Sequence, residues 1–401
     1  MKIAIVGLLH HPIAEPFAGG MESHTWWLAK KLIERGHDVT LFASGESDAT
    51  LGLQPCIERS FETNPKAKTL LGRQACNMSA YAEVIRRVCS GSFDVVHNNA
   101  LHPFLLTSAA DLPTPMLTVL HTPVYKELAA AVQYAAARNT LGRLAAVCVS
   151  KNLAAEWDAF VPSCVVHNGI DVESWPFLSE PCLESSVNEA LWYGRIVPEK
   201  APHLAIQAAL MAGYQIEIAG PISDRTYFEN NIQPLLNNPS VRYLGHLAQS
   251  NIKQTLLRAK VFLNTSVWEE PYGLVYAEAL ASGTPVATFD SGAAKEILTE
   301  RCGVIAKERT VAALAEAVAA AAELSPADCR ARAMSFCHID TMIDAYEQLY
   351  RQLAQRQQAL NRQQTSKATT PSDTPSDTPS DIMLKGQQGL AQMQALVGIA
   401  T

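Results

Sequence analysis

The sequence has little charge and no excess of positive charge. Only 18% of its 401 residues are charged, and 32 Lys and Arg residues are outnumbered by 39 Asp and Glu residues. Proteins that bind nucleic acid usually carry clustered basic residues, so a net charge of -7 argues against that class. We therefore expect no nucleic-acid partner.

Paired cysteines and long apolar runs are also missing. The nine cysteines are irregularly spaced from Cys56 to Cys337, without a C-x-x-C pair. This pattern favours buried, reduced thiols over a disulfide framework or a zinc site. No apolar run reaches the roughly 18 residues that a membrane-spanning helix needs, and the opening MKIAIVGLLHH lacks the cleavage site of a signal peptide. We expect a cytoplasmic protein.

What the sequence does contain is a regular alternation of short apolar runs and helical patterns. A chain of 401 residues is too long for one ordinary domain and suits two. Helical spacing at 22–35 ends at Gly36, and a second helix is predicted at 202–211. Strands are predicted at 2–6, 38–43, 95–97, 116–120, 146–149, 164–166, 191–193, 215–219, 241–243, 261–264 and 285–288. Such alternation predicts an α/β protein with two tandem, doubly wound parallel sheets.

The pattern divides the chain into four parts. We predict an N-terminal Rossmann-like domain at 1–178 and a second at 179–338, followed by a helix at 339–362 that packs back on the first domain. The remaining 363–401 are expected to be a disordered linker and tail, because 370–381 repeat the unit TPSD three times. The weakly apolar stretch 382–401 has enough helical character for a short helix.

The strongest motif is EEPYGLVYAEALASGTPV at 269–286, in which Gly273 lies between Glu270 and Glu278. A glycine turn that enters a helix exposes backbone N–H groups, here those of Leu274 and Val275, and phosphates bind at such helix ends. Eight residues of helix would separate the carboxylates by up to ~12 Å, whereas glycosidase pairs need roughly 5–9.5 Å. We interpret the glutamates as contacts to opposite ends of a long ligand; the alternative is a helix with two solvated glutamates.

This segment resembles the signature of glycosyltransferase family 4. The resemblance implies a GT-B fold, with a cleft between two Rossmann-like domains, and a retaining transfer from a nucleotide-sugar co-substrate without metal or other cofactor. It also implies that Glu270 contacts hydroxyls of the donor sugar and that Glu278 contacts those of the ribose. Glu269 is adjacent, but only Glu270 keeps the spacing.

Two further segments resemble family motifs. YGRIVPEK at 193–200 resembles the motif in which an Arg and a Lys hold the donor diphosphate, here Arg195 and Lys200. Their charge would replace a metal ion at the leaving group; the alternative is a surface salt-bridge cluster with Glu199. Gly20, in the Gly-Gly pair before the first helix, resembles the glycine loop that lets the backbone approach the donor.

The remaining candidates follow predicted strands. His121 resembles a family histidine at a strand end close to the reacting sugar. It is not expected to be a general base, because the donor phosphate is thought to take the acceptor proton. Gly245 and His246 match the place where the family holds the nucleotide base by backbone contacts, and 97–99, His-Asn-Asn, are candidates for the acceptor pocket.

The runs at 40–47 and 202–228 look like the antibiotic- and pterin-glycosylating subgroup, which favours a UDP-linked hexose over GDP-mannose. The acceptor, whether a small molecule, a glycan or a lipid, is not readable from the sequence.

The sequence fits other functions of related folds less well. An NAD-dependent dehydrogenase needs G-x-G-x-x-G after the first strand, and Gly7 begins no such run. A phosphorylase of this fold would show a pyridoxal lysine motif, and a sugar-nucleotide epimerase is a related option. A catalytically inactive relative that binds sugar nucleotides or a partner protein stays open. A solvated surface is favoured over a membrane-binding face for the basic residues Lys66, Lys68, Arg73, Arg86 and Arg87.

Overall fold

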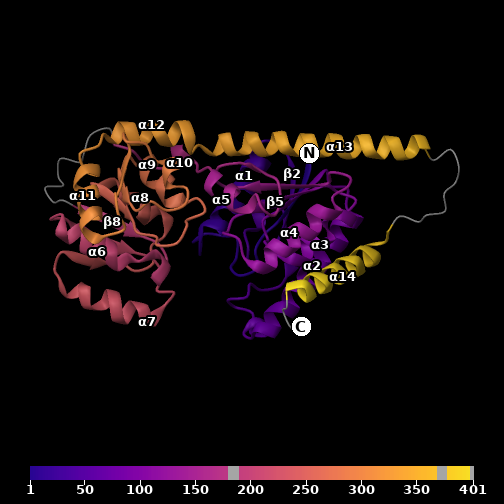
Figure 1. Cartoon of the computed structure of the whole chain (residues 1–401), viewed down its shortest axis with the longest axis horizontal. Coiled ribbons are helices and arrows are strands. Elements are labelled where there is room, and N and C mark those ends of the chain that lie inside the picture. The colour runs from indigo at the N-terminus through magenta and orange to yellow at the C-terminus, as the bar shows by residue number, and fades with distance from the viewer. Residues whose placement is uncertain (179–188, 368–376, 398–401) are drawn as a thin grey trace. The chain divides into compact units, whose positions relative to one another are not determined.

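The computed structural model describes residues 1–178, 189–367 and 377–397. The chain forms two compact units, which we describe one at a time (Figure 1). The N-terminal unit comprises Met1–Val149, Leu153–Val166 and Ile343–Thr401, and the C-terminal unit comprises Ser150–Asn152 and His167–Met342. Each unit contains one wholly parallel sheet, which confirms the predicted pair of Rossmann-like folds.

The N-terminal sheet has the order β3-β2-β1-β4-β5-β6-β7. Its first strand is buried from Ile3 to Val6, because helices cover both faces of the sheet. The strands are β1 (Lys2–Val6), β2 (Asp38–Ser44), β3 (Leu53–Ile57), β4 (Val95–Asn98), β5 (Met116–Leu120), β6 (Leu144–Cys148) and β7 (Ser163–Val165). The helices are α1 (Gly20–Glu34), α2 (Leu70–Ser90), α3 (Pro103–Ser108), α4 (Lys126–Arg138) and α5 (Lys151–Trp157), whose first two residues belong to the C-terminal unit.

The C-terminal sheet has the order β10-β9-β8-β11-β12-β13. Its core gathers Trp192, Ile216, Leu263, Phe289 and Val318 from strands, a strand end and one helix. The strands are β8 (Glu189–Tyr193), β9 (Gln215–Ala219), β10 (Val241–Tyr243), β11 (Val261–Asn264), β12 (Val286–Thr288) and β13 (Gly303–Ile305). The helices are α6 (Pro202–Met211), α7 (Arg225–Tyr227), α8 (Gln249–Arg258), α9 (Leu274–Ala281), α10 (Ala294–Ile297), α11 (Val311–Ala321) and α12 (Pro326–Phe336).

Two strands were not predicted, β3 and β13. Each lies at an edge of its sheet, where one side of the strand has no neighbour to bury it. β3 contains Pro55 and is half-exposed, and β13 is only three residues long. Neither therefore shows the apolar run that marks the inner strands.

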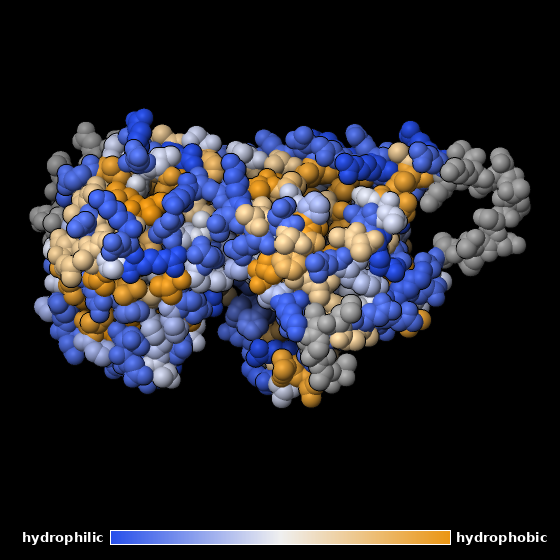
Figure 2. Space-filling model, viewed as in Figure 1, coloured by the Kyte–Doolittle hydropathy of each residue, from blue (hydrophilic) through white to orange (hydrophobic). Residues whose placement is uncertain are grey.

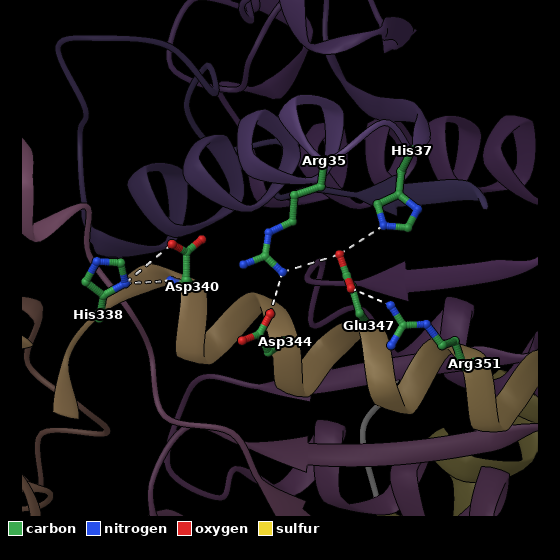
Figure 3. A network of polar contacts seen from close by, with 7 residues as sticks. All are labelled: Arg35, His37, His338, Asp340, Asp344, Glu347 and Arg351. Atoms are coloured by element: carbon green, nitrogen blue, oxygen red, sulfur yellow. Dashed lines mark hydrogen bonds and ion pairs between the residues drawn. The ribbon is translucent and has the colours of Figure 1, made fainter. Parts of the chain in front are cut away.

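Helix α13 (Ile339–Lys367) extends from the C-terminal unit onto the N-terminal unit, to which its residues from Ile343 belong. Ile343, Tyr346, Tyr350 and Leu353 are buried at helical spacing, and hydrophilic residues cover the side seen in Figure 2. Polar contacts to Arg35 and His37, in the turn between α1 and β2, reinforce this packing (Figure 3). Glu347 accepts from Arg35 at 3.4 Å, from His37 at 3.1 Å and from Arg351 at 2.6 Å.

The tail differs from its prediction. Helix α14 (Pro379–Val397) packs on α2, α3 and α4, and buries Ile382 and Met393 (Figure 1). Gly386 permits close contact, since a Cβ there would lie 2.0 Å from Ser108 Oγ, and Thr107 Oγ1 donates to the Gly386 carbonyl at 2.9 Å. The short helix allowed at 382–401 is therefore present, and the expectation of disorder is wrong for α14 and for 363–367, which continue α13. Residues 368–376 and 398–401 lie outside the described residues.

Two expectations from composition can be compared with the structure. All eight cysteines in the described ranges are free thiols, but only four of them are buried. Among the helices that the structure describes, none combines the length and the apolar character needed to cross a membrane.

Candidate active site

Arg195 and Lys200 lie in the segment that follows β8. Arg195 is exposed, and no ion pair or hydrogen bond of its side chain is found within the described residues. The segment ends in a tight turn, because Ala201 adopts a left-handed conformation at φ 46°. Thr265 Oγ1 stabilises this turn by donating to the carbonyls of Lys200 and Ala201 at 2.9 and 3.0 Å.

Lys200 forms an ion pair with Glu270, a residue 70 positions later in the chain. The same carboxylate oxygen, Oε2, accepts from Ser266 Oγ at 3.0 Å and from Trp268 Nε1 at 3.2 Å. No donor to the other oxygen, Oε1, occurs among the residues that the structure describes. One carboxylate oxygen of Glu270 is therefore fixed by protein, and the other is available to accept hydrogen bonds from a ligand.

The Glu270 backbone is tied to the loop after β12. The Glu270 carbonyl accepts from Ala293 N at 3.1 Å, and its N–H donates to Ser291 Oγ at 3.4 Å. Gly292 must be glycine, because a Cβ there would lie 1.9 Å from the Glu270 carbonyl oxygen. These contacts hold Glu270 rigidly, as a residue that orients a reacting group must be held.

Glu269 points to different partners from those of its neighbour. It accepts from Gly292 N at 2.7 Å and from Arg309 Nη2 at 3.1 Å. Arg309 also donates to the carbonyls of Val267 and Asp290, at 3.1 and 2.7 Å. Glu269 and Arg309 therefore join two loops, which separates Glu269 from Glu270 in role.

Gly273 is the N-cap residue that directly precedes helix α9. Its φ of 86° is in the region that favours glycine, and no side chain caps the helix. The first N–H groups of a helix have no acceptor within it, so those of Leu274 and Val275 are suited to a phosphate. The helix begins only at Leu274. The expected separation of Glu270 and Glu278 along a helix therefore applies only to the part from Leu274 to Glu278.

Glu278 lies on α9 and accepts a hydrogen bond from Tyr193 Oη at 2.5 Å through Oε2. Burial raises the pKa of the Glu278 carboxyl above its usual value, against the lowering effects of the Tyr193 hydrogen bond and of Lys253. No hydrogen bond to Oε1 is found in the described ranges. Like Glu270, Glu278 therefore has one oxygen paired with protein and one available.

Gly245 follows β10 and has a φ of 76°, with its carbonyl accepting from Gly220 N at 2.8 Å. A Cβ on Gly220 would lie 1.9 Å from the Gly194 carbonyl oxygen. Three glycines thus allow the carboxyl ends of β8, β9 and β10 to approach closely, where ligands bind in this type of sheet. His246 is exposed beside Gly245.

The other candidates belong to the N-terminal unit. His121 directly follows β5 and is buried, and its Nε2 lies 2.9 Å from Asn99 Oδ1. Gly20 is the exposed first residue of α1. Of the five basic residues considered for a membrane face, Arg86 and Arg87 both pair with Glu83, which favours the solvated surface.

Sequence reasoning missed Tyr193, Ser266 and Trp268, which hold the predicted residues in place. Residues 97–99, expected at the acceptor pocket, are completely buried, and Asn99 contacts His121 instead. It also missed a groove of 720 Å³ beside the Glu269 loop, whose lining includes Lys295 paired with Asp290. Within the described part of the chain, no three His, Cys, Asp or Glu side chains are grouped so as to hold a metal ion. Metal independence stays a prediction.

Comparison with known families agrees with this geometry. Residues 183–334 match the model of glycosyl transferases group 1, and residues 18–174 match the model of glycosyltransferase family 4. The chain belongs to glycosyltransferase family 4. The expectation that it is a transferase is thereby confirmed at the level of the family.

Relatives of the chain differ in named activity. The chain is 33% identical over 160 residues to a glycogen synthase of Mycobacterium tuberculosis, an alignment that spans 38% of either protein. It is 25% identical over 329 residues to the phosphatidyl-myo-inositol mannosyltransferase of Mycobacterium leprae, with 77% of this chain and 85% of that protein covered.

Solved structures of low identity share the fold. Sucrose-phosphate synthase from Thermosynechococcus elongatus is 18% identical with a TM-score of 0.71, over 88% of this chain and 98% of that one. Anabaena HepE in complex with UDP-glucose is 17% identical with a TM-score of 0.65, over 87% and 99% of the two chains. At these identities the likeness concerns the GT-B fold alone.

Proposed function

We propose that the chain is a retaining glycosyltransferase that transfers a hexose from a nucleotide sugar, with a UDP-linked donor favoured, to an acceptor hydroxyl. The observation that carries the proposal is the contact between Lys200 and Glu270. It brings together the residue expected to bind the diphosphate and the residue expected to bind the sugar. Residues of these types, 70 positions apart, meet at the carboxyl edge of a parallel sheet, where such folds bind nucleotides.

The donor would be held from both ends. The free Oε1 atoms of Glu270 and Glu278 are suited to hydroxyls of the hexose and of the ribose, respectively. Between them, the N–H groups at the start of α9 would bind phosphate oxygens. This arrangement matches a ligand with hydroxyls at both ends and a diphosphate in the middle.

The leaving diphosphate gains charge as the bond between its oxygen and the sugar C1 breaks. Arg195, exposed and without a protein partner in the described residues, would bind that charge with Lys200. The acceptor oxygen then bonds to C1 on the face that the diphosphate leaves, and its proton passes to a phosphate oxygen. No protein base is needed, and the two cations replace a metal ion.

The relatives support the class of reaction and leave the donor to be decided. UDP-glucose occurs in the neighbour from Anabaena, whereas the Mycobacterium leprae relative is named as a mannosyltransferase. The subgroup resemblance favours the UDP-linked hexose. The acceptor is proposed only as a hydroxyl of a small molecule, glycan or lipid, and the free thiols favour a cytoplasmic location.

The experiment compares Arg195→Ala with the native chain after exhaustive chelation. We expect native turnover to survive chelation, and Arg195→Ala to lose about 10²-fold in turnover while folding normally by circular dichroism. A strict requirement for manganese or magnesium would overturn the metal-free mechanism. Near-native turnover in Arg195→Ala would remove that residue from the leaving-group site. Donor binding without any transfer in the native chain would favour an inactive sugar-nucleotide binding protein.

A further inference from the structure

A buried chain of hydrogen bonds runs behind His121 in the N-terminal unit. Asn99 Oδ1 lies 2.9 Å from His121 Nε2 and 3.1 Å from His97 Nε2. Asn99 Nδ2 donates to Thr25 Oγ1 at 3.1 Å, and His97 Nδ1 lies 2.6 Å from Tyr350 Oη on α13. His97, Asn99 and Tyr350 are completely buried, so water does not compete for these bonds.

The positions of the protons in this chain follow from Thr25. Its hydroxyl donates to the Met21 carbonyl at 2.8 Å, so towards Asn99 it can only accept. The amide NH2 of Asn99 must therefore face Thr25, and Oδ1 must face both histidines. An amide oxygen only accepts, so the Nε2 atoms of His97 and His121 both carry protons.

The same argument extends to the two histidines at the other end of this chain of hydrogen bonds. Burial lowers the pKa of His97 to about 3 and that of His121 well below its usual value, so both rings are neutral near pH 7. A neutral ring with a proton on Nε2 has a bare Nδ1. In His97 that atom accepts from the Tyr350 hydroxyl. In His121 no protein donor to Nδ1 is found in the described residues.

We propose that Asn99, oriented by Thr25 and by the His97–Tyr350 pair, is a positioning residue that fixes His121 with its proton on Nε2, so that Nδ1 accepts a hydrogen bond from a substrate hydroxyl. The proposal rests on the proposed function, because it places a sugar hydroxyl at His121. It makes α13, which lies outside both family models, part of the site's support. It also excludes His121 as a donor of Nδ1–H to the substrate.

The Tyr350 hydroxyl has a matched control on the same helix. Tyr346 is equally buried and its ring stacks on that of Tyr350 with centroids 6.1 Å apart. Its hydroxyl has no hydrogen-bond partner among the described atoms. Tyr346→Phe therefore removes a hydroxyl of the same kind from the same environment without breaking the chain.

The test combines nitrogen NMR of histidine-labelled protein with steady-state kinetics. In the native chain, His121 should show a protonated Nε2 and an unprotonated Nδ1. Asn99→Leu should mix the two tautomers and lower kcat by about tenfold or more with little change in donor KM. Asn99→Asp keeps an acceptor oxygen towards both rings but loses the donor to Thr25, so it should keep the Nε2 protons of both rings and restore part of kcat. Tyr350→Phe should shift the His97 nitrogens, and Tyr346→Phe should change neither signal nor rate.

Some outcomes would overturn the proposal. A protonated Nδ1 of His121 in the native chain would do so at once. Unchanged His121 nitrogen signals and unchanged kcat in Asn99→Leu would show that Asn99 does not position the ring. If no nucleotide sugar is turned over, the proposed function fails, while the nitrogen signals still decide the tautomer. Should Asn99→Leu not fold, Tyr350→Phe and Tyr346→Phe are compared instead. Equal effects of these two variants on the histidine nitrogen signals would contradict the proposed chain of hydrogen bonds.

Discussion

Glu278 shows how one side chain can be prepared for a ligand by leaving half of it unpaired. Its Oε2 is bound by Tyr193 at 2.5 Å, and no donor to its Oε1 is found within the described ranges. The ribose is bound in both the ground and the transition state, so Glu278→Gln should remove uniform binding. We expect the donor KM to rise by about tenfold with kcat nearly unchanged, since a hydrogen bond to a charged group contributes about 1.5–3 kcal/mol. Equal losses in kcat and kcat/KM would contradict this role.

The same residue predicts how donor binding depends on pH. Because burial raises the pKa of Glu278, its carboxylate takes up a proton at a higher pH than an exposed glutamate does. The protonated acid is a weaker acceptor, so donor KM should increase as the pH falls through that pKa. In Glu278→Gln the increase should be absent. Donor KM measured from neutral to acidic pH in both proteins checks this prediction, and identical profiles would contradict it.

At the scale of elements, Glu347 is one of the polar residues that attach α13 to the rest of the N-terminal unit (Figure 3). Burial raises the pKa of Glu347, but hydrogen bonds from His37 and Arg35 outweigh this, and the pKa is lowered overall. A lowered pKa contributes stability above the unfolded value, and that stability is lost as the pH falls through the folded value. Glu347→Gln should therefore destabilise the protein near neutral pH by about 1–3 kcal/mol, and less in acid.

Asp344 is the matched control for Glu347. It pairs with the same Arg35 at 2.6 Å, but its side chain is 70% exposed, against 11% for Glu347. Exposed pairs contribute little, so Asp344→Asn should cost under about 1 kcal/mol. Denaturant unfolding measures both variants. Equal destabilisation would mean that burial does not decide the value of these contacts.

Helix α14 gives a second prediction at this scale. Gly386→Val should displace the helix, because a side chain there collides with Ser108, whereas Gln388→Val introduces the same side chain at an exposed position. We expect faster proteolysis of the tail and a lower Tm in Gly386→Val only.

Ending the chain after Asn361 should also lower Tm but leave turnover per folded molecule intact, because the site residues lie elsewhere. Loss of turnover in the stably folded, shortened chain would give the tail a catalytic role.

The sequence indicated a short helix in the tail, but it could not reveal that α14 docks on the N-terminal unit, for a physical reason. Its docking uses glycines, Gly386 and Gly389, which remove side chains from the contact and so weaken the apolar periodicity. The neighbouring TPSD repeat has the composition of a linker, and this composition led to the prediction of a disordered tail at 363–401. By contrast, the inner strands were predicted almost to the residue, because strands buried on both faces are continuous apolar runs.

At the scale of the whole molecule, the sequence predicted the residues that could face a ligand better than those that hold them. Arg195, Lys200, Glu270 and Glu278 could be found by spacing and resemblance. Their supports could not, because Tyr193 reaches Glu278 across 85 positions and Tyr350 reaches His97 across 253. Such contacts depend on the order of strands in the sheet and on the path of α13, neither of which a local pattern contains.

The measurement that tests the central claim most directly is a panel of UDP- and GDP-linked hexoses, assayed for nucleotide release and for glycosylated product from cell extract. We expect release and product with a UDP-hexose, a retained anomeric configuration, and a loss of about 10²-fold in turnover in Glu270→Gln with a changed ranking of donors. Glu269→Gln should lower stability but keep the ranking, because Glu269 joins loops through Arg309. No product from any donor, an inverted product, or native turnover and ranking in Glu270→Gln would contradict the account.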